Sequence, residues 1–156
     1  MRMLLPAVAL AIAGCAATPP PPAALPPPAA AGAGLEGTSW RLAAFQSMDD
    51  RQGNTRIEEP SRYTVSFGAD GRARFQIDCN RGTGSFTDEP SADGRGGQLR
   101  FGPVATTRMA CADPGISDQL ARHLEYVRSY VLRDGRLFMA LMADGGIYEW
   151  EPAPAD

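Results

Sequence analysis

Residues 73–87 read ARFQIDCNRGTGSFT and show the strand-and-turn pattern on which the fold prediction rests. The first half of this stretch alternates apolar Ala73, Phe75 and Ile77 with polar side chains, which is the period of a β-strand with one buried face. A polar turn follows, and a second, shorter strand is expected around 85–87. The stretch therefore predicts β-structure in which turns separate short strands.

The same alternation continues on both sides of this stretch. Strands are expected at 40–44 and 63–67 before it, and at 98–104, 136–142 and 147–151 after it. The last two flank Ala143-Asp144-Gly145-Gly146, which is a strong hairpin signal. Two polar segments, 47–60 and 88–97, are expected to be loops.

One segment has the period of a helix instead. Asp113 is a favourable N-cap, and Pro114 suits the first helical position. We expect a helix that lays one apolar stripe against the sheet, with His123 at the edge of the stripe. Each residue of a helix turns about 100° around the axis, and at that rotation the stripe occupies an arc of about 80°. Its members are Ile116, Leu120, Leu124, Val127 and Val131.

The N-terminal region is typical of a bacterial lipoprotein precursor. Arg2 precedes the apolar run 4–12, which is too short to span a bilayer but suits a secretory signal. Ile12-Ala13-Gly14-Cys15 follows, so residues 1–14 are expected to be a lipoprotein signal peptide that is removed before Cys15. An ordinary signal peptide that contains a cysteine is the alternative.

The rest of the chain then divides into three parts. Residues 15–34 are expected to be a lipidated Cys15 and a Pro/Ala-rich linker, 35–152 one folded domain and 153–156 a tail. A diacylglycerol and an N-acyl chain such as palmitate would anchor Cys15 stably, because stable anchoring takes more than one chain. Ala16 after Cys15 favours the outer membrane, with the domain facing the periplasm.

Composition excludes several functional classes. All 15 basic residues are arginine, against 18 acidic residues, for a net charge of −3. A mildly acidic chain lacks the basic face that nucleic acid requires. Without lysine, Schiff-base chemistry and a phosphate-loop lysine are excluded. We predict no catalytic, cofactor or metal site. The alternatives are His123 as a general base or ligand and an incomplete calcium loop at 49–54.

Two motifs carry a family resemblance. Asp-Cys-Asn-Arg-Gly-Thr-Gly-Ser-Phe at 78–86 and Thr-Thr-Arg-Met-Ala-Cys at 106–111 resemble the META domain, which heat-shock lipoproteins of the HslJ type carry. The likeness extends through 39–42 and 135–137 and covers 35–150. It implies an α+β fold, in which a strongly curved antiparallel β-sheet has one α-helix packed across it, and it implies no enzymatic activity.

The resemblance also suggests how the remaining cysteines behave. Cys79 and Cys111, an even pair in an exporting context, match the two motif cysteines of the family, which implies one disulfide between them. A redox-active pair is the alternative, although neither cysteine belongs to a Cys-X-X-Cys motif.

The expected function is that of a binding module. The resemblance implies a non-enzymatic accessory protein in envelope stress response or antibiotic tolerance, with an envelope protein or a hydrophobic ligand as partner. The alternative is an inhibitor of a host lysozyme or protease that inserts the loop 88–97. Five residues beside the motif cysteines are candidates for an interaction: Asn80, Arg81, Thr107, Arg108 and Met109.

Overall fold

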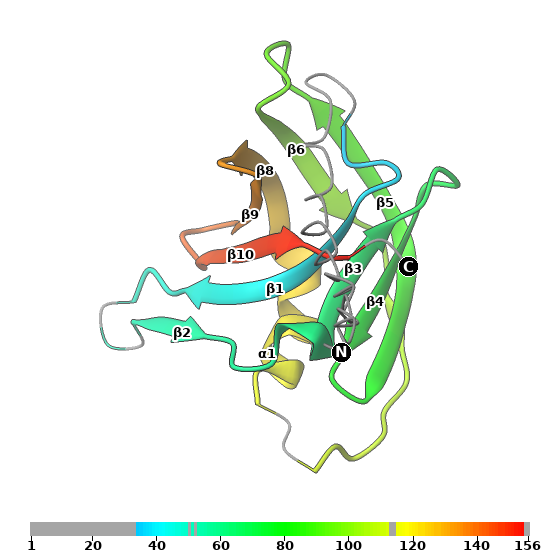
Figure 1. The fold of residues 1–156 in the computed structure, drawn as a ribbon, viewed down its shortest axis with the longest axis vertical. Helices are drawn as coiled ribbons and strands as arrows, with labels where there is room; N and C mark the ends of the chain where they lie inside the picture. Colours follow the sequence, from blue (N-terminus) through cyan, green and yellow to red (C-terminus); the bar gives the residue numbers. More distant parts are fainter. Residues whose placement is uncertain (1–33, 50, 52, 113–114, 155–156) are drawn as a thin grey trace, which may run out of the picture.

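The computed structural model describes residues 34–49, 51, 53–112 and 115–154. The expected signal peptide, nearly all of the linker, Asp113 and Pro114 lie outside these residues. The described chain is mostly β, and eight of its strands form a closed antiparallel barrel with one short helix at one end (Figure 1).

The barrel strands follow one another around the ring in the order β1, β3, β4, β5, β6, β8, β9 and β10. Two short strands lie off the ring, β2 (Asn54–Arg56) beside β1 and β7 (Ala105–Thr106) beside β5. The helical elements are η1 (Pro60–Arg62), α1 (Ser117–His123) and η2 (Leu124–Tyr126). The ring strands are β1 (Ser39–Gln46), β3 (Tyr63–Phe67), β4 (Arg72–Ile77), β5 (Asn80–Pro90), β6 (Gly96–Phe101), β8 (Val127–Arg133), β9 (Arg136–Leu141) and β10 (Ile147–Pro152).

The expected open sheet with a helix across its face is wrong. β1 pairs with β3 through residues 39–41 and with β10 through residues 40–46, which closes the ring. An open sheet would leave two edge strands with unpaired N–H and C=O groups, and closure pairs these groups within the chain. α1 has only seven residues, and it lies at the lower end of the barrel in Figure 1 rather than across a face.

The expected helix is also too long. α1 ends at His123, and Val127 and Val131 belong to β8 instead. β8 pairs with β6 on one side and β9 on the other, so it completes the ring between them. This non-local pairing outweighs the helical spacing of the apolar residues. As a result Val131 is 49% exposed, not buried in a stripe.

Two strand expectations change in detail. β1 contains a bulge between Leu42 and Ala44, so Phe45, 3% exposed, takes the inward place that simple alternation gives to Ala44. The expected loop 88–97 is largely strand, because β5 runs to Pro90 and β6 begins at Gly96. Only residues 91–95 form the connection between them.

The barrel interior is occupied by its own side chains. Trp150, Tyr148, Phe67 and Leu99 are each at most 1% exposed, and they belong to one continuous hydrophobic cluster. Ile116, Leu120 and Leu124 close the end of this cluster from α1 and its flanks. The exposed side chains of the described residues therefore lie on the outside of the barrel and around the helix.

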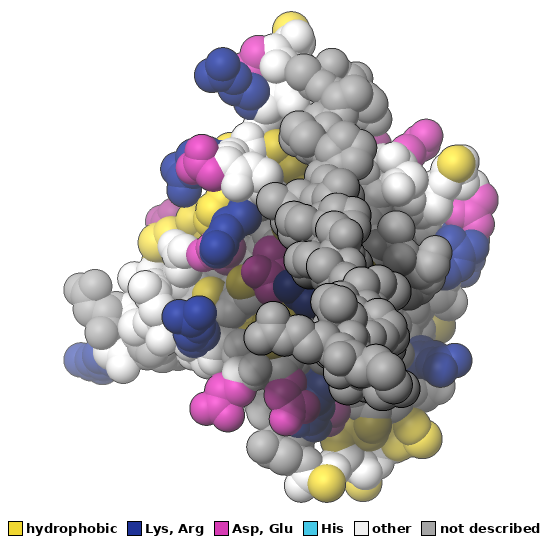
Figure 2. Space-filling view, in the orientation of Figure 1, with side chains coloured by type: hydrophobic (Ala, Val, Ile, Leu, Met, Phe, Trp, Pro, Cys, Tyr) yellow, Lys and Arg dark blue, Asp and Glu magenta, His cyan; other side chains and the backbone are white. Residues whose placement is uncertain are grey.

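The outer surface carries both signs of charge. Acidic and arginine side chains are interspersed over the face drawn in Figure 2. None of the described helices combines the length and apolar character needed to cross a membrane.

Candidate functional site

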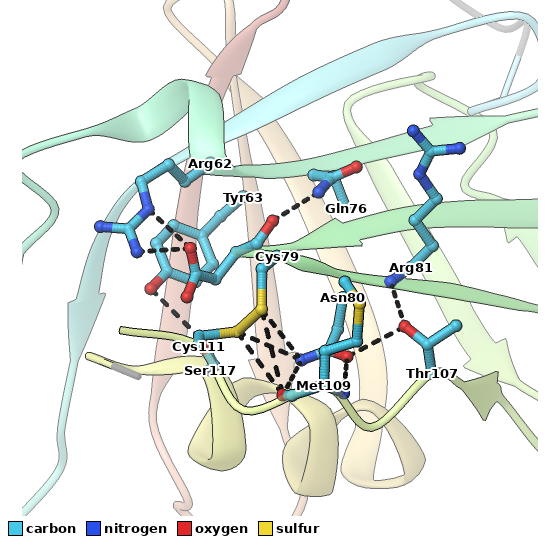
Figure 3. The surroundings of a disulfide bond; sticks show 11 residues. Arg62, Tyr63, Gln76, Cys79, Asn80, Arg81, Thr107, Met109, Cys111 and Ser117 are labelled. Atoms are coloured by element: carbon cyan, nitrogen blue, oxygen red, sulfur yellow. Dashed lines mark hydrogen bonds and ion pairs between the residues drawn. A yellow bond between two sulfur atoms is a disulfide. The ribbon is translucent and has the colours of Figure 1, made fainter. Parts of the chain in front are cut away.

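Four of the five predicted interaction residues, Asn80, Arg81, Thr107 and Met109, lie near the disulfide in Figure 3. We call the disulfide corner the region formed by Arg62, Asp78, Cys79, Asn80, Thr107, Met109 and Cys111. Cys79 lies in the two-residue turn between β4 and β5, which Ile77 and Asn80 close as a pair. Cys111 lies in the segment that leads to α1. The disulfide joins the two cysteines with their Cα atoms 5.8 Å apart, so it ties this turn to the approach of the helix.

Asn80 and Thr107 brace the corner. The Asn80 side-chain oxygen accepts hydrogen bonds from Met109 N, at 2.7 Å, and from Thr107 Oγ1, at 2.9 Å. Its Nδ2 donates to the Met109 carbonyl at 3.2 Å. Thr107 Oγ1 in turn accepts from the backbone N–H of Arg81 at 3.0 Å. The side-chain amide of Asn80 thus pairs with the Met109 backbone as a neighbouring strand would.

The other three candidates point outward. The side chains of Arg81 and Arg108 are exposed, and Met109 is 59% exposed. The structure therefore separates the five predicted residues into two whose side chains make the bracing contacts and three whose side chains are exposed. Their role in an interaction stays a prediction.

Asp78 is a member of this corner that the sequence interpretation did not single out. It is 7% exposed and adopts a φ of 57° in the β4–β5 turn, a backbone region that favours glycine. Arg62 Nε donates to Asp78 Oδ1 at 2.7 Å, and this bond raises the pKa of the Arg62 guanidinium. Asp78 Oδ2 is buried and has no hydrogen-bond partner.

A second region lies at the other end of α1, in a pair of adjoining depressions that we call the His123 cleft. The polar depression, of about 420 Å³, is lined by Phe45, Ser47, Asp49, Gln119, Arg122, His123, Asp144 and Gly145. The apolar depression, of about 330 Å³, is lined by His123, Tyr126, Leu141, Met142, Ala143 and Gly145. His123 and Gly145 belong to both, so one ligand could contact a polar and an apolar wall together.

The surroundings of His123 in this cleft favour its neutral form. Its Nδ1 lies 2.9 Å from the Tyr148 hydroxyl, and its ring contacts the rings of Phe45 and Tyr148. Burial, followed by repulsion from Arg122, lowers the pKa of His123. Burial also raises the pKa of Tyr148, which keeps its hydroxyl protonated. The expected helix-edge histidine is therefore a hydrogen-bonded part of the cleft wall.

Sequence reasoning missed most of this cleft, because its lining comes from three separate places in the chain. Tyr126 and Met142 are 43% and 44% exposed, an unusual position for large apolar side chains. The hairpin signal at 143–146 predicted the turn that forms one wall of the cleft. Nothing in the sequence indicated that this hairpin meets the end of α1.

Within the described residues, one group of three side chains brings metal-ligating atoms close together. The ligand atoms of Asp78, Cys79 and Cys111 all lie within 4.8 Å of one another. In the disulfide state the two sulfur atoms are bonded to each other and are not available as thiolate ligands.

Comparisons with known proteins agree with this architecture. The family model of the META domain matches residues 33–150. No curated protein matches the chain. Among solved structures, the chain is similar to a DUF4847 family protein from Bacteroides vulgatus ATCC 8482, whose crystal structure was determined at 1.00 Å resolution. The TM-score is 0.50 at 10% identity, over 78% of this chain and 96% of that chain. At this identity the likeness concerns the fold alone.

Proposed function

The chain belongs to the META domain family, and on that premise we propose that it is a lipid-anchored binding module of the bacterial cell envelope. It acts without catalysing a reaction, from the outer membrane and facing the periplasm, as an accessory protein in envelope stress or antibiotic tolerance. Its partner is an envelope protein that docks on the outside of the barrel.

The observation that carries the proposal is the position of the exposed apolar side chains. The barrel interior is filled by the core cluster, whereas Tyr126 and Met142 are nearly half exposed on one wall of the His123 cleft. Methionine and tyrosine are well suited to protein contacts, because one adapts its shape and the other combines a ring with a hydroxyl. The cleft is therefore the docking surface in this proposal.

An inserted loop is less well supported as the binding element. The turn between β5 and β6 is held by its own hydrogen bonds, from Ser91 Oγ to Asp93 and to the Gly96 carbonyl. Residues 91–95 read Ser-Ala-Asp-Gly-Arg and contain no aromatic anchor for an enzyme cleft. The alternative of a lysozyme or protease inhibitor has no comparable observation in its favour.

Anchoring is tested separately from docking. The lipid anchor is supported by the sequence Ile12-Ala13-Gly14-Cys15 and by the Pro/Ala-rich linker behind it. Cys15→Ser is expected to abolish incorporation of labelled palmitate and to release the protein from the membrane fraction. Retention of Cys15→Ser in washed outer membranes without detergent would contradict the anchor.

Docking is tested by site-specific photocrosslinking in living cells. A photoreactive residue in place of Met142 or Tyr126 is expected to form one recurrent adduct with an envelope protein, identified by mass spectrometry. Val131 is the matched control, because it is apolar and 49% exposed on β8 but does not line the cleft. An adduct that forms equally from position 131, or none from 126 and 142, would rule out the cleft as the docking surface.

A further inference from the structure

The disulfide corner brings together three side chains whose chemistry the bracing role does not use. Asp78, Cys79 and Cys111 place a carboxylate oxygen and two sulfur atoms within 4.8 Å of one another. Two of these residues are adjacent in the chain and the third is 32 positions from Cys79. The fold itself therefore assembles the cluster.

Asp78 is the part of the cluster that most needs an explanation. Its Oδ2 is buried and unpartnered, although buried carboxylate oxygens are normally hydrogen-bonded. Arg62 contacts the other oxygen, Oδ1. The turn position, with φ at 57°, would suit glycine better than aspartate. An aspartate that is strained, buried and half satisfied beside two sulfur atoms suggests a ligand for Oδ2.

We propose that the disulfide corner, once reduced, binds one divalent ion of the zinc class through the thiolates of Cys79 and Cys111 and through Asp78 Oδ2. Two sulfur ligands and one oxygen ligand suit this borderline-soft ion. Three protein ligands leave the fourth position of the tetrahedral ion for water. The site is then gated by oxidation, since the disulfide and the metal use the same sulfur atoms.

The geometry and the charges are compatible with such an ion. Two sulfur atoms that each lie about 2.3 Å from a tetrahedral metal are about 3.7 Å apart. The Cα atoms of the two cysteines are 5.8 Å apart, so their sulfur atoms remain neighbours when the bond between them is broken. Two thiolates and one carboxylate carry three negative charges. The divalent ion offsets two of these charges, and the Arg62 guanidinium, which Asp78 shares with Glu59, lies against the third.

Neighbouring groups already face the sulfur atoms. Asn80 Nδ2 lies 3.3 Å from Cys111 Sγ and 3.8 Å from Cys79 Sγ, where it can donate to a thiolate. Donors of this kind orient and stabilise metal ligands from outside the coordination sphere. Asn80 thus has a second use beyond bracing the Met109 segment.

The redox step is a two-electron exchange. A dithiol reductant breaks the Cys79–Cys111 bond and becomes a disulfide itself, while its two protons pass to the two cysteine sulfurs. The incoming ion then displaces both protons as it binds the thiolates. Oxidation reverses the step and releases the ion.

The test uses the full chain with Cys15→Ser, which leaves Cys79 and Cys111 as the two cysteines. The protein is reduced with a phosphine without oxygen and titrated with Zn²⁺ against a chromophoric chelator. Co²⁺ is then used to record thiolate charge-transfer bands. We expect one ion per reduced chain and none per oxidised chain. Asp78→Asn, which keeps both thiols, is expected to weaken Zn²⁺ binding about tenfold or more.

Glu59→Gln is the matched control. Glu59 is a second described carboxylate near Arg62, at 3.8 Å, and it is exposed. This variant should bind Zn²⁺ like its parent. If the Asp78→Asn variant binds Zn²⁺ as tightly as its parent, the ion is bound by two adventitious thiols alone, and the proposal is overturned. Absence of binding to the reduced chain would overturn it as well.

Reduction of the disulfide could lower the stability of the fold, so thermal unfolding is measured as a second test of Zn²⁺ binding. Zn²⁺ that binds the folded reduced chain must raise its melting temperature, because a ligand that binds the native state stabilises it. The oxidised chain should show no shift. A reduced chain that is unfolded and that Zn²⁺ does not refold would also overturn the proposal.

Discussion

At the scale of single residues, the Asn80 side chain makes the pair of backbone hydrogen bonds that a neighbouring strand would make. Its side-chain amide accepts from Met109 N and donates to the Met109 carbonyl across 29 positions of sequence. No backbone ladder reaches this far, because β7 ends at Thr106. One amide side chain therefore holds the segment that carries Cys111 toward the barrel.

We predict that Asn80→Ala lowers the free energy of unfolding by about 2 kcal/mol, because it leaves the Met109 N–H and carbonyl without their protein partner. Urea unfolding followed by circular dichroism measures the change. Arg81→Ala, at the next position, removes an exposed side chain and should change stability by less than about 0.5 kcal/mol. Equal effects of the two substitutions would show that the amide bonds do not stabilise the corner.

His123 gives a pH dependence whose sign follows from its lowered pKa. Burial and Arg122 lower the pKa of His123 in the folded protein below its ordinary 6.5. Between the two pKa values the unfolded chain binds more protons, so stability rises with pH in that window. The contribution of neutral His123 to folding stability is fully present above about pH 6.5. It is lost as the pH falls through the pKa of His123 in the folded protein.

We therefore predict that the protein becomes less stable between pH 7 and pH 5, and that His123→Gln flattens this slope. In the protonated ring Nδ1 carries a hydrogen, so the Tyr148 hydroxyl would then have to accept from it. Asp70 and Asp93 have pKa values lowered from 3.8, so their effects belong to more acidic solutions. Urea midpoints across this pH range measure the slope. An unchanged slope in His123→Gln would assign it to other groups.

At the scale of elements, two tight turns shape the hairpins of β8, β9 and β10. Asp134 and Gly135 connect β8 to β9, and both have positive φ. Residues 142–146 connect β9 to β10; within them Ala143 and Asp144, with φ of 53° and 54°, are the central residues of a turn that Gly145 N closes by donating to the Met142 carbonyl. Positive φ at both central residues is the mirror-image turn that suits twisted hairpins.

Alanine is a poor residue for such a turn, so we predict that Ala143→Gly raises the free energy of unfolding by about 0.5–1 kcal/mol. The opposite substitution in the neighbouring turn, Gly135→Ala, should lower it by about 1 kcal/mol. A methyl group at Gly135 meets nothing within 4 Å, so backbone strain alone would cause that loss. Thermal or urea unfolding of the two variants measures both signs, and identical signs would contradict the turn assignment.

The same elements show how far the sequence predicts the fold. Period-two alternation located β3, β4, β9 and β10 closely, because each buries one face along its whole length. It failed at β8, where apolar residues also satisfy a helical period. The two-residue turn signal at Asp134-Gly135 could have indicated that a strand, not a helix, precedes it.

The candidate sites were predictable to different degrees. The cysteine motifs located the disulfide corner because its residues are close in sequence to Cys79 or Cys111. Asp78 lay in the quoted motif, but its buried and unpartnered oxygen is a property of the folded turn. The His123 cleft depends on the meeting of α1, β1 and the β9–β10 hairpin, which no local pattern encodes.

At the scale of the whole molecule, the two tryptophans lie on the strands that close the barrel. Trp40 is on β1 and Trp150 is on β10, and they are 5% and 0% exposed. Leu42 pairs with Trp150, and Trp40 pairs with Pro152. Their fluorescence therefore reports on ring closure between parts of the chain that are about 100 residues apart, whereas the disulfide lies elsewhere in the ring.

This separation predicts that the disulfide stabilises the barrel without being needed to close it. It links residues 32 positions apart, and removal of such a crosslink is expected to cost about 3–4 kcal/mol through the unfolded chain. In a Cys15→Ser background, the variant with Cys79→Ala and Cys111→Ala should keep the native tryptophan emission in buffer. Its urea midpoint should fall, and fluorescence and far-ultraviolet circular dichroism should change together, as in one cooperative transition. Cys15→Ser alone is the control. Emission from solvent-exposed tryptophan before any urea is added would mean that β1 and β10 cannot remain paired unless the disulfide corner is covalently closed.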